Sequence, residues 1–183
     1  MISFKYDKEK AVAVLSYISS KLHENRMESG FHSIFKTLYF AEKKHLSKYA
    51  MPITGDTYIA MEYGPVPSKS YNLFKRIRNN SPLLSDNEKG LFRVEGWVVT
   101  PLQKADMDEL SESDICCIDE SIQENKALSF GERTDKSHGP AWKKAPKDGE
   151  MDFCDIAAEE GASSDVCDLI KLTSENEMFA DSI

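Results

Sequence analysis

The chain has 183 residues, a formal net charge of −8 at pH 7 and four cysteines. That length suits one domain and is enough to bury about two thirds of the surface that the unfolded chain exposes, so the fold needs no disulfide or metal to hold it together. The first residues lack a basic segment followed by an apolar run, and no apolar stretch approaches the roughly 18 residues of a membrane span. We therefore expect a cytoplasmic protein with no membrane partner.

The charge is divided unevenly along the chain. Residues 1–103 carry 15 Lys and Arg against 10 Asp and Glu, a net charge of +5, whereas residues 104–183 carry 8 against 21, a net charge of −13. An acidic half of this kind repels phosphate backbones and steers basic partners towards itself. The same charge also serves solubility, and the sequence leaves both interpretations open.

In chain order, the first predicted helix begins at the cap residue Asp7 and ends near Glu24. A second helix of about five turns begins at Phe31 and ends before Met51-Pro52. Its apolar residues fall on one face, and we expect its polar side chains on the other, namely Lys36, Lys43, Lys44 and Ser47. Residues 58–63 then alternate as in a strand, which Gly64-Pro65-Val66-Pro67 ends because proline cannot donate to a ladder.

The remaining elements follow from turn and capping signals. A third helix begins after Pro67, and residues 91–94 and 97–100 flank a Glu95-Gly96 turn as in a β-hairpin. Ser111 and Ser129 each precede an acidic residue by three positions, a pattern typical of capping boxes, so each predicts a helix. Two last helices are expected near 153–160 and 164–179.

Together these elements predict a mainly helical α+β fold. We expect the strand at 58–63 to join the hairpin in a small three-stranded antiparallel sheet, because a lone hairpin is marginal in water. A single domain is expected over residues 1–183, with a core at about 1–145 and acidic helices at about 150–180.

Long fragments of the chain resemble a known family. The run KTLYFAEKKHLSKYAMPITGDTYIAMEYGPVPSKSYNLFK, residues 36–75, is similar to the central motif of the Panacea domain, the antitoxin domain of SocA-like proteins. The fragments SESDICCIDESI, SHGPAWKKA and DFCDIAAEEGAS resemble the same family. The resemblance implies a bacterial or prophage-associated protein that binds and neutralises a toxin encoded by a neighbouring gene. A variant of this expectation is an adaptor that delivers the toxin to a protease.

We expect the partner to bind where tyrosines and a rigid proline turn meet, because such side chains form an interface at low entropic cost. Ile59, Met61 and Tyr63 are expected on the inward face of the strand, with Tyr58, Glu62 and the turn outside. His138 and Trp142 lie in a second shaped segment. The candidate partner-binding residues are Tyr58, Glu62, Tyr63, Gly64, Pro65, Val66, Pro67, His138 and Trp142.

A DNA-binding regulator is the alternative function. Residues 155–171 have a small residue, a turn glycine and a second helix start at about the offsets of a helix-turn-helix. However, that second helix would present Asp165 and Asp168 to the groove, and duplex DNA binding depends on neutralising phosphates. A winged arrangement that uses the cluster Lys75, Arg76 and Arg78 with the hairpin also stays open. Nucleic acid is therefore not the favoured partner.

No catalytic motif, metal site or cofactor site is predicted, and we expect a protein that is not an enzyme. GxSxG, HExxH and a glycine-rich phosphate loop are all absent from the sequence. His32 and His45 lie about 20 Å apart along one helix, too far to share a metal. Cys116, Cys117, Cys154 and Cys167 lack the CxxC spacing of zinc sites and are expected to be buried, reduced thiols.

Overall fold

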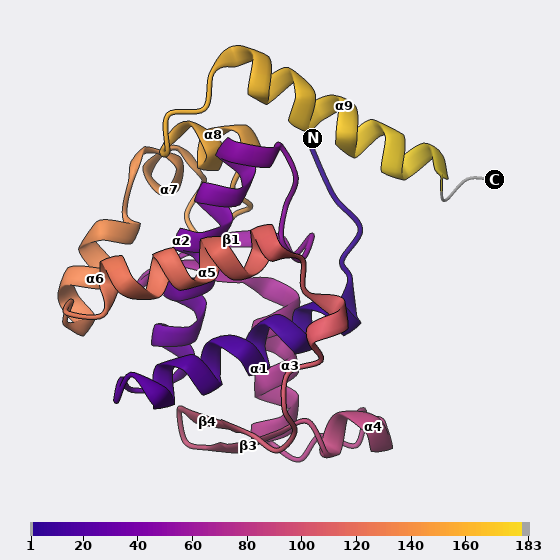
Figure 1. Ribbon diagram of the computed structural model, residues 1–183, viewed down its shortest axis with the longest axis vertical. Helices are drawn as coiled ribbons and strands as arrows, with labels where there is room; N and C mark the ends of the chain where they lie inside the picture. Colours follow the sequence, from indigo (N-terminus) through magenta and orange to yellow (C-terminus); the bar gives the residue numbers. More distant parts are fainter. Residues whose placement is uncertain (1, 181–183) are drawn as a thin grey trace.

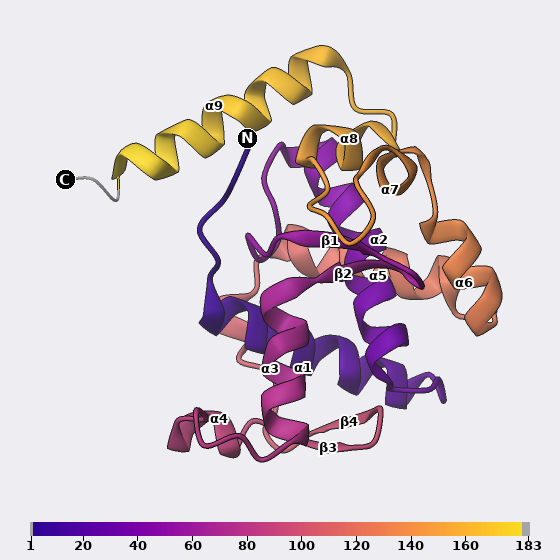
Figure 2. The same ribbon diagram turned by 180° about the vertical axis from the view of Figure 1, so that it is seen from behind.

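Helix α2 (Phe31–Tyr49) runs through the middle of the computed structural model, which describes residues 2–180 (Figures 1 and 2). Around it lie helices α1 (Lys8–Glu24), α3 (Ser68–Arg78), α4 (Asp86–Lys89), α5 (Glu112–Asn125), α6 (Phe130–Ser137), α7 (Pro140–Lys144), α8 (Phe153–Ala158) and α9 (Ser164–Ala180), with a 3-10 turn at Met107–Glu109. The strands are β1 (Tyr58–Met61), β2 (Gly64–Pro67), β3 (Phe92–Glu95) and β4 (Val98–Pro101). The mainly helical α+β class is confirmed. The predicted domain also includes residue 1 and residues 181–183, which lie outside the described part.

The predicted three-stranded sheet is wrong, because the four strands form two separate two-stranded sheets. β3 pairs with β4 as expected, but β1 pairs with β2, with Met61 opposite Gly64 and Tyr58 opposite Pro67. Gly64 adopts a φ of 93°, which lets the chain reverse directly after Glu62 and Tyr63. The segment that was expected to end the strand is therefore its antiparallel partner.

The two prolines of β2 fit because of the register of this hairpin. Pro65 lies opposite Ala60 and Pro67 lies opposite Tyr58. The backbone groups of those two β1 residues bond to another segment: Ala60 N–H donates to Gly149 O over 2.9 Å, and Tyr58 O accepts from Met151 N–H over 2.9 Å. No ladder donor is thus needed from either proline. Residues 148–151 therefore cover the free edge of β1.

Helix α2 is buried on nearly every side, which corrects the predicted polar face. Lys36, Lys43 and Lys44 are all buried, together with Glu42. Each charged group has a specific partner: Lys36 Nζ donates to Pro65 O over 2.9 Å, and Lys44 Nζ donates to Glu124 over 2.7 Å. A helix with this pattern is a central core element and not an amphipathic surface helix.

Two groups of buried apolar residues share α2. The first contains the N-terminal half of α2 and side chains of α1, α3, α5 and the β3–β4 hairpin. The second contains the C-terminal half of α2 with β1, α8 and Ile170 of α9. The aromatic rings of Phe35 and Phe74 stack 5.4 Å apart in the first group, and Phe4 and Phe153 meet edge to face in the second.

The predicted helix starts are confirmed where the signals are local. Asp7 caps α1, and Ser111 and Ser129 form capping boxes with Asp114 and Glu132 at the starts of α5 and α6. Helix α4 was not predicted, although Ser85 and Glu88 form a further capping box at its start. The short helix α7 was not predicted either.

The C-terminal helices pack onto the second apolar group. α9 buries Ile170, and its Ser174 hydroxyl donates to the carbonyl oxygen of Ser3 over 2.6 Å. Cys154 and Cys167 are joined as a disulfide that connects α8 and α9, so the expectation of reduced thiols is wrong for this pair. Cys117 is a buried free thiol as expected, whereas Cys116 is exposed because it lies on the outer side of α5.

Candidate functional site

The candidate site lies where the β1–β2 turn meets α6 and α7. We call this surface the hairpin face and define it by Glu62, Tyr63, Phe130, His138 and Trp142. Glu62 and Tyr63 form the exposed turn, Phe130 begins α6, and the other two residues flank the start of α7. Three segments that are distant in the sequence thus supply one surface.

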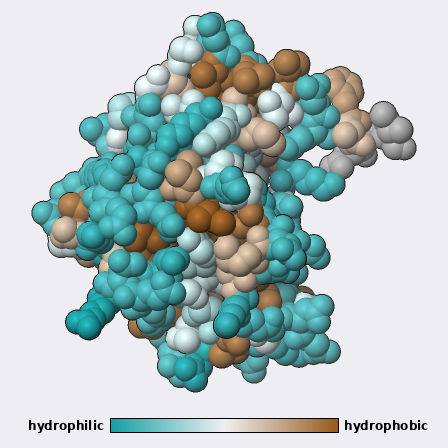
Figure 3. Space-filling model, viewed as in Figure 1, coloured by the Kyte–Doolittle hydropathy of each residue, from teal (hydrophilic) through white to brown (hydrophobic). Residues whose placement is uncertain are grey.

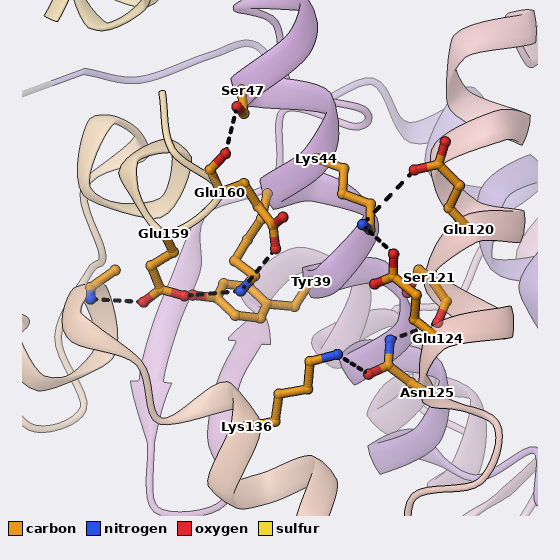
Figure 4. Close-up of polar contacts among 12 residues, drawn as sticks. Tyr39, Lys44, Ser47, Glu120, Ser121, Glu124, Asn125, Lys136, Glu159 and Glu160 are labelled. Atoms are coloured by element: carbon orange, nitrogen blue, oxygen red, sulfur yellow. Dashed lines mark hydrogen bonds and ion pairs between the residues drawn. The ribbon is translucent and has the colours of Figure 1, made fainter. Parts of the chain in front are cut away.

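The start of α7 is held in place by a buried carboxylate of the following segment. Glu159 Oε1 accepts a hydrogen bond from the Ala141 backbone N–H over 2.8 Å, and its Oε2 accepts from Tyr39 and Lys43 over 3.2 Å each (Figure 4). The carboxylate therefore satisfies a free N–H of the first helical turn. A Cβ at Gly139 would collide with the Glu159 side chain, which explains the glycine of the HGPAW segment.

Trp142 connects α7 to the hairpin. Its indole N–H donates to Met61 O over 2.9 Å, and its ring stacks on His138 with centroids 3.8 Å apart. Burial lowers the pKa of His138, and the charge of Lys36 lowers it further. A neutral imidazole against an indole favours a packing role. Beside this pair lies a pocket of about 350 Å³, lined by Ala60, Met61, Glu62, Trp142, Lys143, Ala145 and Lys147.

On the other side of the turn, aromatic rings lead from the surface into the core. Tyr63 is 58% exposed, and its ring lies 5.9 Å from that of Phe130, which in turn stacks on His32 at 3.8 Å. Burial lowers the pKa of His32 to about 3, and the charges of Lys36 and Arg133 contribute. His32 is thus neutral at physiological pH and supports the exposed rings from below.

The nine candidate residues divide into exposed and buried groups. Glu62 and Tyr63 are exposed, and Val66, His138 and Trp142 are half-buried around the same turn. Gly64, Pro65 and Pro67 are buried and shape the turn from inside. The expectation that Tyr58 lies outside is wrong, because its side chain is 0% exposed and packs edge to face on Tyr39. The strand faces are the reverse of those predicted, with Tyr58 and Ala60 inward.

Phe130 is the residue of this face that sequence reasoning missed. It follows the cap residue Ser129 directly, and its side chain is about half exposed at the start of α6. A large aromatic residue in the first turn of a short polar helix was the available signal. Its proximity to Tyr63 is a tertiary contact that no local pattern indicates.

In the core, away from the hairpin face, a buried histidine lies beside a carboxylate. His45 Nε2 lies 3.4 Å from Asp114 Oδ1, and Lys10 Nζ lies 2.9 Å from Asp114 Oδ2. His45 and Asp114 are both buried, and burial lowers the pKa of His45. Within residues 2–180, no group of three His, Cys, Asp or Glu is arranged to hold a metal ion. Over the same residues, no helix has the length and apolar character that crossing a bilayer requires.

The segment weighed for DNA binding forms α8 and α9. Gly161 adopts a φ of 81° between them, so a turn is present where the sequence suggested one. Asp165 and Asp168 are exposed on α9, and the nearby Lys171 pairs with Asp168 over 2.9 Å. An exposed face with this charge repels phosphate. The regulator alternative stays a prediction.

Comparison with known protein families gives one match for this chain. Residues 34–143 match the family model described as antitoxin SocA-like, Panacea domain. The match covers more than half of the chain and includes every residue of the hairpin face, so the protein belongs to the SocA-like Panacea antitoxin family. The resemblance inferred from the sequence is confirmed over these residues, and the fragment DFCDIAAEEGAS lies outside the match. No curated protein and no solved structure matches the chain.

Proposed function

We propose that this protein neutralises a cognate protein toxin, encoded by a neighbouring gene, by direct binding through the hairpin face. The observation that carries the proposal is that the exposed Tyr63 and Phe130 lie on one side of the β1–β2 turn and the half-buried Trp142 on the other, all within the family-matched residues 34–143. Exposed aromatic side chains held by a rigid support are typical of binding hot spots.

The support beneath this surface favours a rigid docking site. Lys36 Nζ donates to Pro65 O, Trp142 donates to Met61 O, and Glu159 holds the start of α7. A surface that is already ordered loses little entropy when a partner binds. The proposed mechanism is steric occlusion, in which bound antitoxin covers the toxin surface and no bond is made or broken.

Co-expression with the neighbouring toxin gene tests the proposal. The wild-type chain should restore growth and co-purify with the toxin, whereas the double variant Tyr63→Ala/Phe130→Ala should lose both effects while it remains folded. Trp97→Ala is the matched control, because Trp97 is an exposed aromatic at the turn of the other hairpin. Failure of the wild-type chain to restore growth or to co-purify would overturn the proposal.

If the protein is instead an adaptor, rescue of growth should depend on a protease. If the chain delivers the toxin to a protease, rescue should disappear in cells that lack the protease although the complex still forms. Steric occlusion predicts that rescue persists in those cells.

A further inference from the structure

Helix α9 lies outside the family-matched residues 34–143, and its buried residues are Ile170 and Ser174, four positions apart on one side of the helix. Its inner side buries Ile170, bonds Ser3 through Ser174 and accepts the Lys5 N–H at Glu177 over 3.2 Å. In Figure 1 the helix extends along one end of the molecule, beyond α8. Its outer side is therefore open.

The outer side of α9 carries an apolar stripe. Leu169, Leu172 and Phe179 are separated by three and seven residues, so they lie along one side of the helix. They are 50%, 52% and 71% exposed. Figure 3 shows hydrophobic surface gathered at this end of the molecule, at the place of α9 in Figure 1. The spacing is the one by which an amphipathic helix anchors in an apolar groove.

Acidic side chains border this stripe. Asp168 and Glu175 lie on the same border of the stripe, four residues before and three residues after Leu172. Asp168 is paired with Lys171 over 2.9 Å, so Glu175 is the acid on this border that an approaching basic group would meet first. Both are exposed, within the half of the chain that carries a net charge of −13. A second copy would bring two acidic borders together, which costs free energy. A groove bordered by Lys or Arg would instead pair with them.

We propose that the outer side of α9 docks into an apolar groove with basic borders on the toxin, as a second contact surface beside the hairpin face. This inference rests on the proposed function, because the occupant is the same toxin. The occupant is assigned by charge complementarity and by the helical spacing of Leu169, Leu172 and Phe179. Because α9 lies outside the family-matched span, it would add recognition specific to this chain's own partner.

The affinity of the purified chain for the purified toxin tests the inference, measured by calorimetry with kinetics at two salt concentrations. Leu172→Ala/Phe179→Ala should weaken the affinity about tenfold or more, because the exposed apolar anchors are lost while alanine preserves the helix. Glu175→Lys should slow association at low salt, since steering by the acidic border is reversed.

Two controls lie on the β3–β4 hairpin, at the end of the molecule opposite α9 (Figure 1). Glu95→Lys repeats the charge change at an exposed position, and Trp97→Ala removes an exposed apolar side chain there. Both should bind the toxin like the wild type.

The outcomes separate this inference from the proposed function. If the wild-type chain binds and the α9 variants bind equally well, α9 is not a docking surface, although the proposed function stands. A self-dimer in sedimentation that Leu172→Ala/Phe179→Ala abolishes would assign the stripe to a second copy and overturn the inference. If the wild-type chain forms no complex with the toxin, both proposals fail.

Discussion

The indole N–H of Trp142 donates a hydrogen bond to the carbonyl oxygen of Met61 over 2.9 Å, which joins α7 to the last residue of β1. The bond connects two segments 81 residues apart in the sequence. It fixes the hairpin turn against the His138 and Trp142 pair, so the shape of the hairpin face depends on it.

Replacement of Trp142 by phenylalanine should lower the free energy of unfolding by about 1 kcal/mol, because a ring remains for His138 but the donor to Met61 O is lost. Urea unfolding measures the change. Trp97→Phe is the control, since Trp97 is 60% exposed. Equal effects of the two substitutions would show that the Met61 bond contributes nothing to stability.

Replacement of Glu159 by glutamine should lower the free energy of unfolding by about 2 kcal/mol, because the buried Lys43 loses its closer carboxylate, at 3.2 Å, and keeps only that of the more exposed Glu160, at 3.4 Å. Lys43→Met in the same background should recover part of the loss, since the weakly compensated buried charge is then removed. Thermal and urea unfolding measure both. Asp86→Asn, in an exposed pair with Lys89, should change stability by less than about 0.5 kcal/mol. A loss of similar size at Asp86 would contradict the assigned role of burial.

Glu42 should make stability fall as pH rises through the neutral range. Burial raises its pKa from 4.5 to about 8, against a hydrogen bond from the Ile53 N–H, and Asp56 and Asp114 raise it further. Between pH 4.5 and 8 the folded protein keeps a proton that the unfolded chain releases, so the free energy of unfolding decreases with pH. Glu42→Gln should flatten this decrease in urea unfolding at pH 5, 6.5 and 8. An unchanged slope would contradict the prediction.

Lys36 should make the free energy of unfolding rise with pH, the opposite of the effect of Glu42, and at higher pH. Burial lowers its pKa from 10.5 to about 7, so between these values the unfolded chain holds a proton that the folded protein has lost. The free energy of unfolding therefore increases with pH in this window. Lys36→Met should remove the increase between pH 7.5 and 9.5 and should stabilise the protein most below pH 7. A variant that keeps the wild-type pH dependence would assign the increase to other groups.

The sequence predicted what local chemistry decides. Asp7, Ser111 and Ser129 form their capping bonds within three residues. The predicted β3–β4 hairpin is present, but its turn is Gly96-Trp97, one residue later than expected, because Glu95 pairs with Val98. Such signals need no knowledge of distant contacts. The helix starts and the β3–β4 hairpin were correct for this reason.

The rest depended on contacts between distant segments. Lys43 is buried because Glu159, 116 residues later, neutralises it. Pro65 fits in β2 because the opposite residue, Ala60, makes its backbone hydrogen bonds to residues 148–151 and needs no donor from the proline. The alternation at 58–63 defines two strand faces, but packing against Tyr39 decides that Tyr58 is the inward one. Of the candidate site, the sequence therefore located the turn and Trp142 but reversed the strand faces and missed Phe130.

Amide hydrogen exchange of the chain with and without purified toxin tests the central claim most directly. Bound toxin should slow exchange at the turn of residues 61–64 and at residues 130–142, and it should leave the β3–β4 hairpin unchanged. Formation of a stable complex with no protection at 61–64 and 130–142 would contradict the assignment of the hairpin face as the toxin-binding surface.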